Sequence, residues 1–373
     1  MIKAIEDLEL QHFDCFCHKI NLSLNDGLEH STKSVPEIKY QIKICRELVA
    51  YFNRSKNFQK ILSDQQEITG TTRNGLVQDI VTRWNSTLAM LQRILQQRPL
   101  TLAHIDFPEL KLPNFELVKN LTVILTPFDT FTKQLSKREE SISSVLPVYK
   151  CLLSVLTEKE TDEPMIRAFK KIVSNGLKTR MFNSEKKRSA FLVLYLSLLR
   201  FLIISTLIDP RYKNNANIFD FADRIQNKAI LQSEIEFFVH PERRSTGSGS
   251  PKIITTDQTT NPLSNFLSTN TTGPDENFQM LDESTSTPVL DEIEAFFKSP
   301  TLDINSDSLA WWKNNNDYNR IKQLVPRFLC PPPSTVESER TFSKLSEIYS
   351  QRRSNLSAEH AKMQLFLHFN FDD

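Results

Sequence analysis

The chain has 373 residues, of which 46 are Lys or Arg and 45 are Asp or Glu, so its formal net charge is only +1 at pH 7. This length predicts one large domain or two of ordinary size and is ample for a buried core. Only seven residues are glycine, the residue that tight hairpins and phosphate-binding loops need most. The composition therefore argues against a hairpin-rich sandwich, a Rossmann protein and a P-loop ATPase, and it favours a mostly helical fold.

The charge balance and the cysteines narrow the functional classes further. A net charge of +1 produces no global field toward nucleic acid, so any DNA contact must come from local patches. The five cysteines are scattered, with no CxxC pair, which is typical of a reducing compartment rather than of a disulfide framework. The N-terminal segment has no apolar stretch after a basic start, so we expect no secretory signal.

The predicted elements begin with a short strand over residues 2–13 and a helix over Cys17–Leu28. Helical periodicity then continues from Val35 to Phe237. Within it, the apolar spacing and the prolines that interrupt it predict helices over residues 38–52, 77–98, 115–135, 141–157 and 163–173.

The segment from Ala190 to Ile208 is the most apolar part of the chain and is nearly long enough to cross a membrane. Arg200 lies near its middle, and a charge there costs about 2.5–3.5 kcal/mol on insertion scales. We therefore interpret the segment as a buried helix of a large helical domain and expect no membrane among the partners.

Residues 241–289 differ in composition from the segments on either side. They are dominated by Ser, Thr, Asn, Asp and Pro, and so few apolar side chains cannot offset the entropy lost on ordering the chain. We predict a disordered linker here. Order is expected to resume at residue 290 and to continue to Asp373.

Two glutamates near the C-terminus receive different interpretations. Ser334 followed by Glu337 fits a capping box, with Ser334 as the N-cap and Glu337 reaching back to it. On the helix that follows, Glu339 lies at the border of the face that carries Phe342 and Leu345. We therefore expect Glu339 to face inward at the edge of a core.

The last block of the chain is rich in large apolar side chains. Trp311 and Trp312 open it, and the final helix, predicted to be N-capped by Ser357, is apolar around nearly its whole circumference. A helix that is apolar on all sides must be buried on all sides. Since few elements of the chain remain to cover it, we expect a partner chain to bury Leu365, Phe366 and Phe369.

Four motifs occur in the order found in hAT-family transposases and their domesticated BED-finger relatives. Cys15-Phe16-Cys17-His18 resembles the family's CxxH, and VTRWNST at 81–87 is similar to its TRWNST. LIDPRYK at 207–213 resembles LLDPRFK. WWKNN at 311–315 and residues 331–370, with a core at Thr335–Ser343, resemble the hAT C-terminal dimerisation region. Together the four motifs span most of the chain.

The resemblance implies a mostly α fold with a truncated RNase H-like α/β core, a long α-helical insertion and a helical dimerisation region. On this basis residues 1–34 are the remnant of the core and residues 35–240 the insertion. Residues 241–289 are the linker, and residues 290–373 are the dimerisation region.

The resemblance also implies an Asp-Asp-Glu triad that binds two Mg²⁺ ions, in which the carboxylates hold the metals that activate the attacking oxygen. Glu339 matches the family's glutamate. The family's two aspartates precede CxxH, whereas only Asp7 and Asp14 precede Cys15 here, in no DN-type context. One carboxylate cannot hold two metals, so we expect no enzymatic activity and no cofactor, with Glu339 as a vestigial catalytic residue.

Two further pairs have competing interpretations. Cys15 and His18, with His12 or Cys17, resemble part of a zinc site, but a structural zinc needs four ligands and no second pair is present. We therefore expect no metal and a packed helix start. By family resemblance Arg83 and Trp84 contact DNA; the alternative for Trp84 is simple packing in a core.

The sequence thus predicts a degenerate or domesticated hAT transposase-derived protein that acts in the nucleus as a DNA-associated homodimer without catalysis. The predicted dimerisation residues are Leu365, Phe366, Phe369, Trp311 and Trp312. One alternative is a piece of an active DNA transposase. The other is a helical protein-interaction scaffold without a DNA role.

Overall fold

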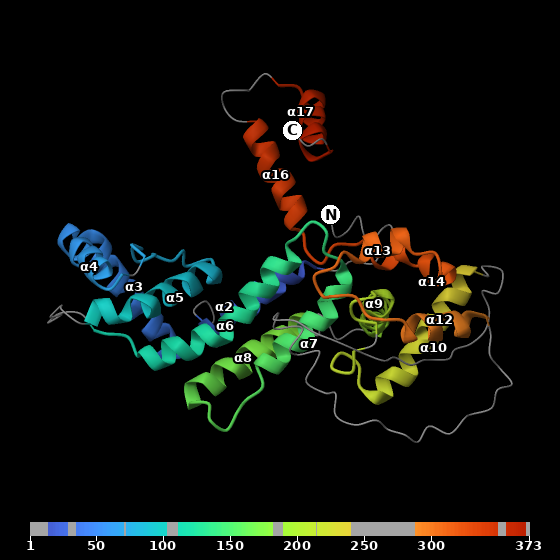
Figure 1. The fold of residues 1–373 in the computed structure, drawn as a ribbon, viewed down its shortest axis with the longest axis horizontal. Helices are drawn as coiled ribbons and strands as arrows, with labels where there is room; N and C mark the ends of the chain where they lie inside the picture. The colour runs from blue at the N-terminus through green and yellow to red at the C-terminus, as the bar shows by residue number, and fades with distance from the viewer. Residues whose placement is uncertain are drawn as a thin grey trace.

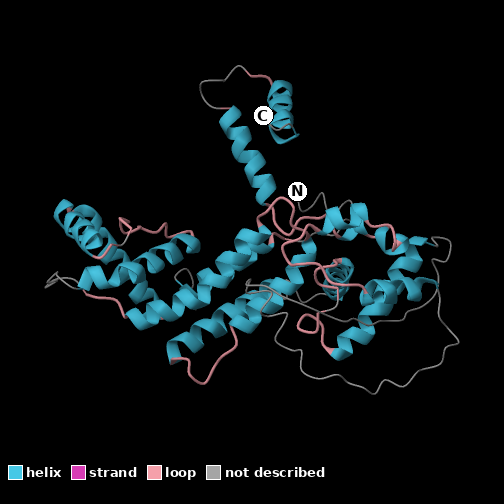
Figure 2. Cartoon of the chain, viewed as in Figure 1, coloured by secondary structure: helices cyan, strands magenta, loops and turns pink. Residues whose placement is uncertain are grey.

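The computed structural model describes residues 14–28, 35–70, 72–102, 111–181, 189–213, 215–239, 288–349 and 356–370. These residues form helices joined by loops, and no strand occurs among them (Figure 2). The mostly α fold is therefore confirmed. The strand predicted at 2–13 lies outside the described residues. So does nearly all of the predicted linker, except that residues 288 and 289 already belong to helix α12 (Pro288–Lys298).

Three long helices form the middle of the molecule: α2 (Phe16–Leu28), α6 (Phe115–Leu135) and α8 (Pro164–Met181). Helix α2 packs closely on α8 because Gly27 has no side chain; a Cβ there would lie 2.6 Å from the ring of Phe169. Helix α7 (Val145–Val155) follows α6 after a single 3-10 turn, η1 (Ile142–Ser144). The sequence predicted α6 with the same bounds, and α2 within one residue.

One end of the molecule is formed by α3 (Pro36–Arg54), α4 (Lys56–Ile68) and α5 (Trp84–Leu102) (Figure 1). The helix predicted over 77–98 begins only at Trp84, and residues 72–80 are extended. The reason is Asp79, whose buried carboxylate accepts hydrogen bonds from the Arg46 guanidinium at 2.6–2.9 Å and from the Thr87 hydroxyl at 3.0 Å. These bonds hold the segment away from a helical path.

The other end contains α9 (Ser189–Ile208), α10 (Phe221–Val239) and four shorter helices. The shorter helices are α12, α13 (Ser308–Asn314), α14 (Asn319–Lys322) and α15 (Val325–Phe328). The C-terminal half of α9 is buried, as its composition predicted, and Leu202, Ile204 and Leu207 are fully inaccessible. Arg200 pairs with Glu234 of α10 at 2.8 Å. Among the described helices none is long and apolar enough to cross a membrane.

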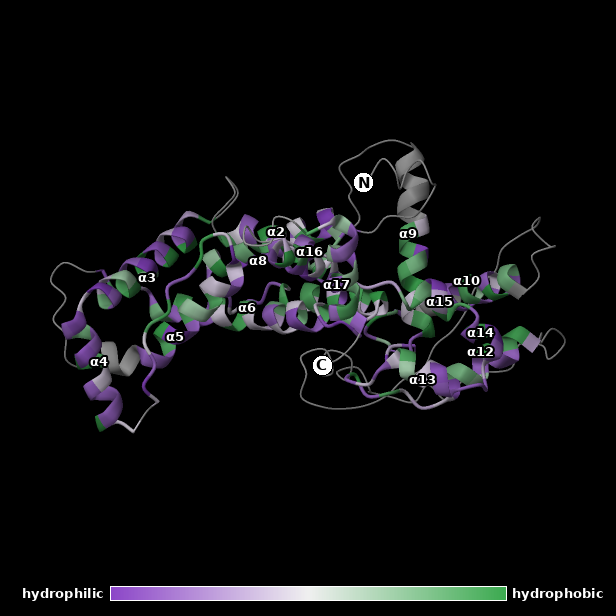
Figure 3. Ribbon diagram, turned by 90° about the horizontal axis from the view of Figure 1, so that it is seen from above, coloured by the Kyte–Doolittle hydropathy of each residue, from purple (hydrophilic) through white to green (hydrophobic). Residues whose placement is uncertain are grey.

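The last two helices, α16 (Val336–Ile348) and α17 (Ala358–Asn370), stand away from the rest of the molecule (Figure 1). We call this pair the arm, and the remaining helices the body. Ile348 is the one buried residue of α16 and Ala361 that of α17. Figure 3 colours the helices by hydropathy, and α3 and α6 of the body each carry both hydrophobic and hydrophilic residues.

Candidate functional site

The arm joins the body at a junction of three segments: the start of α2, the end of α6 and the loop at residues 331–335. The Phe16 N–H donates to the Pro333 carbonyl at 3.2 Å. The Ser334 hydroxyl donates to the Leu135 carbonyl at 2.9 Å. The Thr335 N–H donates to the Cys15 sulfur at 3.4 Å. The CxxH motif and the start of the Thr335–Ser343 core, more than 300 residues apart in sequence, are therefore in contact.

The capping box predicted at the start of α16 is wrong. The N-cap is Thr335, and it makes no side-chain cap hydrogen bond. Ser334 is buried, and its hydroxyl is used by the Leu135 carbonyl of α6. Glu337 instead forms an ion pair with Arg340, one turn further along the helix. The Ser334 hydroxyl donates to α6 and is therefore not the cap of α16 that a capping box requires.

Glu339 is exposed, which contradicts the expected position at the edge of a core. Its carboxylate accepts a hydrogen bond from the Thr335 hydroxyl at 3.2 Å. The expectation assumed that the face with Phe342 packs in a core, but Phe342 is exposed and the arm stands away from the body (Figure 1). Within the described parts of the chain, no three His, Cys, Asp or Glu side chains gather as a metal site would require.

The arm exposes large apolar side chains on both of its helices. Phe342 on α16 is 65% exposed, and Met363 and Phe366 on α17 are 64% and 60% exposed. Leu365 and Phe369, which the sequence also assigned to dimerisation, are half-buried. A hydrogen bond from Arg138 to the Phe369 carbonyl, at 3.2 Å, links the end of α17 to the body. The chain itself leaves much of the final helix uncovered.

Trp311 and Trp312 occupy a different environment from the one predicted for dimerisation residues. Trp312 is 1% exposed, and its indole N–H donates to the Ile208 carbonyl at the end of α9 at 3.0 Å. Its ring centroid lies 5.4 Å from that of Phe296. Trp311 is half-buried beside it, at 4.9 Å between centroids. Both tryptophans therefore belong to the core of the body, and Trp312 offers no surface to a partner.

The LIDPRYK motif forms a buried ionic network that joins the segment after α9 to the segment between α6 and α7. Arg211 is paired with Asp209 at 2.8 Å and with Glu140 at 2.9 Å, and all three side chains are buried. The Ser143 hydroxyl donates to Asp209 at 2.6 Å. Removal of one partner from a buried ion pair of this kind strongly destabilises the protein, because the other charge stays buried without compensation. From the sequence alone this motif had only a family resemblance, because nothing in its spacing identifies Glu140 as a partner.

Lys213, the last residue of the same motif, is fully buried and reaches the C-terminal end of α12. Its ammonium group donates to the Phe296 carbonyl at 2.6 Å and to the Ser299 hydroxyl at 2.5 Å, and it lies 4.3 Å from the centroid of the Phe296 ring. The carbonyls at a helix C-terminus favour a cation. Burial nevertheless lowers the pKa of Lys213 to about 7. This lysine holds α12 against the end of α9.

The TRWNST motif separates into an exposed and a buried part. Arg83 is exposed at the end of the extended segment, and its N–H donates to the Ile80 carbonyl at 2.8 Å. Trp84 is only 3% exposed and packs in the core at the start of α5. The alternative of simple packing therefore describes Trp84, and its ring is not available to stack on a base. Arg83 keeps an accessible guanidinium.

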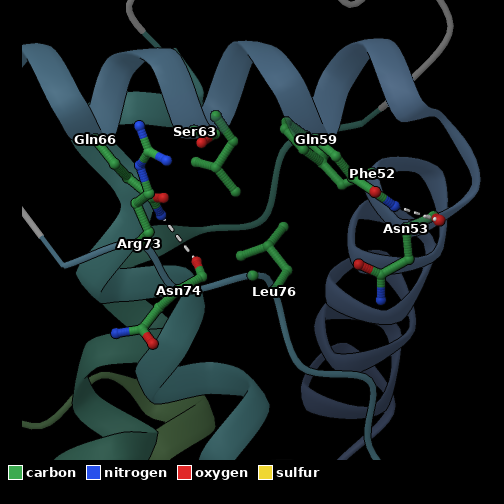
Figure 4. A pocket seen from close by; sticks show the side chains of 10 residues that line it. Phe52, Asn53, Gln59, Ser63, Gln66, Arg73, Asn74 and Leu76 are labelled. Carbon is green, nitrogen blue, oxygen red and sulfur yellow. Dashed lines mark hydrogen bonds between the residues drawn. The ribbon is translucent and has the colours of Figure 1, made fainter.

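A cleft of about 350 Å³ lies beside the extended segment, between α4 and residues 73–76 (Figure 4). Phe52, Leu62 and Leu76 form its apolar lining, and amide side chains surround them. Gln66 donates to the Asn74 carbonyl at 2.8 Å and Arg73 pairs with Glu67 at 2.5 Å. These polar groups are engaged with one another, so the cleft contributes to the local fold rather than identifying a ligand.

Two family models match parts of the chain, one containing the start of α2 and the other the loop at residues 331–335. Residues 292–371 match the hAT family C-terminal dimerisation region, and residues 13–109 match the ZBED1 RNase-like helical domain. Zinc finger BED domain-containing protein 4 of Homo sapiens is 23% identical over 99% of this chain and 30% of its own length.

Two further relatives come from other kingdoms. The "Putative AC transposase" of Zea mays is 22% identical over 93% of this chain and 42% of its own length. The "Putative transcriptional regulator tpeD" of Talaromyces stipitatus is 26% identical over 98% and 42%. The chain thus spans between about a third and two fifths of the length of these relatives. The chain carries the hAT C-terminal dimerisation region and is related to the hAT transposases and the zinc finger BED proteins.

Proposed function

We propose that this chain is a degenerate or domesticated hAT transposase-derived protein that forms a homodimer in the nucleus, associates with DNA and has no transposase catalysis. The observation that carries the proposal is the arm. It lies within the region that matches the hAT dimerisation model, and it exposes Phe342, Met363 and Phe366. A second copy of the chain is the occupant that such a surface fits best.

The apolar character of the arm predicts how the dimer responds to salt. Full burial of one large apolar side chain contributes about 1.5–3 kcal/mol, and several such side chains reach micromolar affinity after the cost of association. An exposed ion pair contributes about 1 kcal/mol at most. Light scattering at 0.1 and 1 M NaCl should therefore give the mass of a dimer at both concentrations. A mass that falls to the monomer value in high salt would contradict an apolar interface.

The proposed DNA association is supported by the exposed Arg83 and by the names of the relatives, among them a transposase and a transcriptional regulator. Each phosphate contact contributes about one unit to the dependence of log K on log salt. Arg83→Ala should therefore weaken binding to duplex DNA and lower that slope by about one, as fluorescence anisotropy over a salt series would show. Lys60→Ala, which removes an exposed cation of α4, is the matched control.

Three results distinguish the candidate functions. If Arg83→Ala and Lys60→Ala weakened DNA binding equally, Arg83 would make no specific contact with DNA. A chain with no DNA affinity at low salt would leave the interaction scaffold as the better description. Cleavage of a terminal-inverted-repeat duplex in Mg²⁺ or Mn²⁺, abolished by Glu339→Ala, would favour a piece of an active transposase. We expect no such cleavage, because Glu339 lies on the arm with no described carboxylates gathered around it as a metal site.

A further inference from the structure

Helix α8 carries charge of one sign only. Five of its residues are Lys or Arg and none is Asp or Glu. By contrast, α3, α4 and α6 each carry acidic residues beside their basic ones, and the whole chain has a formal net charge of only +1. A chain without a global field can attract a polyanion only through a local patch of this kind.

Two of the five cations are engaged with carboxylates of the fold. Lys170 is buried and pairs with Asp162 at 2.7 Å. Arg180 pairs with Asp26 of α2, also at 2.7 Å. The other three are exposed, and no carboxylate of the described residues forms an ion pair with them: Arg167, Lys171 and Lys178.

These three residues lie on one side of the helix, and we call them the basic stripe. At 3.6 residues per turn they fall within an arc of about 40°, and the stripe is about 16 Å long. Exposed Asn175 and half-buried Ser174 lie on either side of it. In Figure 1 α8 runs below α6 at the edge of the body. The stripe is therefore open to a large partner.

The loop before α8 contains four acidic residues: Glu158, Glu160, Asp162 and Glu163. Arg167 lies closest to this loop, because its guanidinium donates to the Glu160 carbonyl at 3.3 Å. Lys171 follows Glu163 by eight residues, about 12 Å along the helix axis. That distance exceeds the Debye length of about 8 Å at physiological ionic strength. The field of Lys171 and Lys178 is therefore the least affected by the acidic loop.

The side chains around the stripe indicate which polyanion fits. No large apolar side chain of α8 is exposed. A protein interface is centred on aromatic or aliphatic anchors, and a membrane-surface helix inserts apolar side chains among the lipids. Duplex DNA needs neither. It carries one negative charge per about 1.7 Å of its axis, and its phosphates are contacted by Lys, Arg, Ser and Asn side chains.

We propose that the basic stripe of α8 binds the phosphate backbone of duplex DNA, with Lys171 and Lys178 each pairing with a phosphate and Asn175 donating a hydrogen bond beside them. The site rests on the proposed DNA association and adds to it a surface on a different helix from Arg83, which precedes α5. Phosphate contacts position a protein on DNA without reading its sequence. Because α8 is packed closely on α2 at Gly27, the stripe holds the duplex in a fixed orientation to the body.

The salt dependence of binding tests the stripe on the full chain. Lys171→Ala/Lys178→Ala is compared with Lys56→Ala/Lys60→Ala, which removes two exposed cations of α4 and changes the net charge equally. Alanine favours helix at exposed positions, so both variants should keep the circular dichroism and thermal unfolding of the wild type. Fluorescence anisotropy with a labelled duplex of mixed sequence then measures the affinity of each protein over a salt series.

The stripe variant should lose about two units of the slope of log K against log salt. Between 50 and 200 mM NaCl the affinity of the wild type should therefore fall about tenfold more than that of the stripe variant. The α4 variant should keep the wild-type slope. Equal slopes for the two variants would overturn the stripe and leave DNA association in place. A wild type that does not bind the duplex at 50 mM NaCl would overturn both.

Lysine acetylation followed by mass spectrometry locates the contact directly. Saturating duplex should slow the acetylation of Lys171 and Lys178 several-fold and leave Lys56 and Lys60 unchanged. Poly-glutamate at the same total charge represents an acidic protein partner, and it should protect the stripe less because its charges are less dense. Equal protection by poly-glutamate, or none by the duplex, would contradict the assignment of the stripe to DNA.

Discussion

The C-terminal dimerisation region contains two parts that use their apolar residues in opposite ways. The first part, α12 to α15, buries Phe296 and Trp312 against α9 and α10 of the same chain. The second part, the arm, exposes Phe342, Met363 and Phe366. Apart from residues 288–291 at the start of α12, both parts lie in the segment matched by one family model. A single sequence region thus completes the core of its own chain and presents a surface that a second chain is suited to cover.

The difference shows that apolar content alone does not identify an interface. The tandem tryptophans are the most prominent apolar residues of the region, yet Trp312 is a core residue that binds the Ile208 carbonyl. The arm is proposed to bind a partner because Phe342, Met363 and Phe366 are exposed among the described residues. Substitutions in the first part should therefore reduce stability, whereas those in the second should reduce association.

The largest effect is expected from Trp312→Ala. Loss of a buried large aromatic side chain costs about 3–5 kcal/mol, and the Ile208 carbonyl also loses its donor. Chemical unfolding followed by circular dichroism should show this loss in the free energy of unfolding. Trp311→Ala, at a half-buried neighbour, should cost clearly less. A Trp312→Ala protein as stable as the wild type but unable to dimerise would erase the distinction between the two parts.

The burial of Lys213 predicts a dependence of stability on pH. Its pKa is about 7 in the folded chain, lowered by burial from an ordinary value of 10.5. Below pH 7 both the folded and the unfolded states carry the proton, so the cost of burying the charge is fully present. Between pH 7 and 10.5 the unfolded state binds more protons, and this contribution to the free energy of unfolding rises with pH.

Urea unfolding at pH 7 and pH 9 tests this contribution against Lys213→Met, which removes it. The wild type should gain more stability than the variant when the pH is raised to 9. An equal change in the two proteins would mean that the carbonyl at the end of α12 keeps the ammonium group charged at both pH values. The difference between the wild type and Lys213→Met measures how much the contact of Lys213 with the end of α12 contributes to the stability of the body.

Smaller effects are expected at the junction, and they separate the observed structure from the predicted capping box. Ser334→Ala leaves the buried Leu135 carbonyl without its donor, which costs about 1–3 kcal/mol. Glu337→Ala removes only an exposed pair with Arg340, worth about 0.5 kcal/mol or less. In a capping box both substitutions would destabilise α16 by similar amounts. Thermal unfolding of the two variants distinguishes these outcomes.

Local patterns predicted some helix bounds well and others less so, since the helix predicted over 163–173 continues to Met181 as α8. The apolar spacing of residues 115–135 gave the bounds of α6, and Ser357 caps α17 as predicted, accepting the His360 N–H at 3.3 Å. The helix start at Trp84 was missed because Asp79 binds Arg46, a residue 33 positions away. Spacing along a chain contains no information on such a partner.

The candidate site was predicted less completely for the same reason. The family resemblance led to Cys15, to Glu339 and to the arm, but it did not show that Cys15 contacts Thr335, 320 residues further along. It also placed Trp312 with the dimerisation residues, because a tryptophan in a core and one at an interface have the same sequence signal. The buried partner of Arg211, Glu140, was likewise visible only in the fold.

The central claim, that the arm and not the tryptophan pair forms the dimer surface, is tested most directly by sedimentation velocity. The wild type and the Leu365→Asp/Phe366→Asp variant would be compared at tens of micromolar protein in 0.15 and 1 M NaCl. We predict a dimer for the wild type at both salt concentrations. We predict a monomer for the variant, with the same thermal unfolding of the body. A wild-type monomer, or a variant that remains a dimer, would contradict the assignment of the arm.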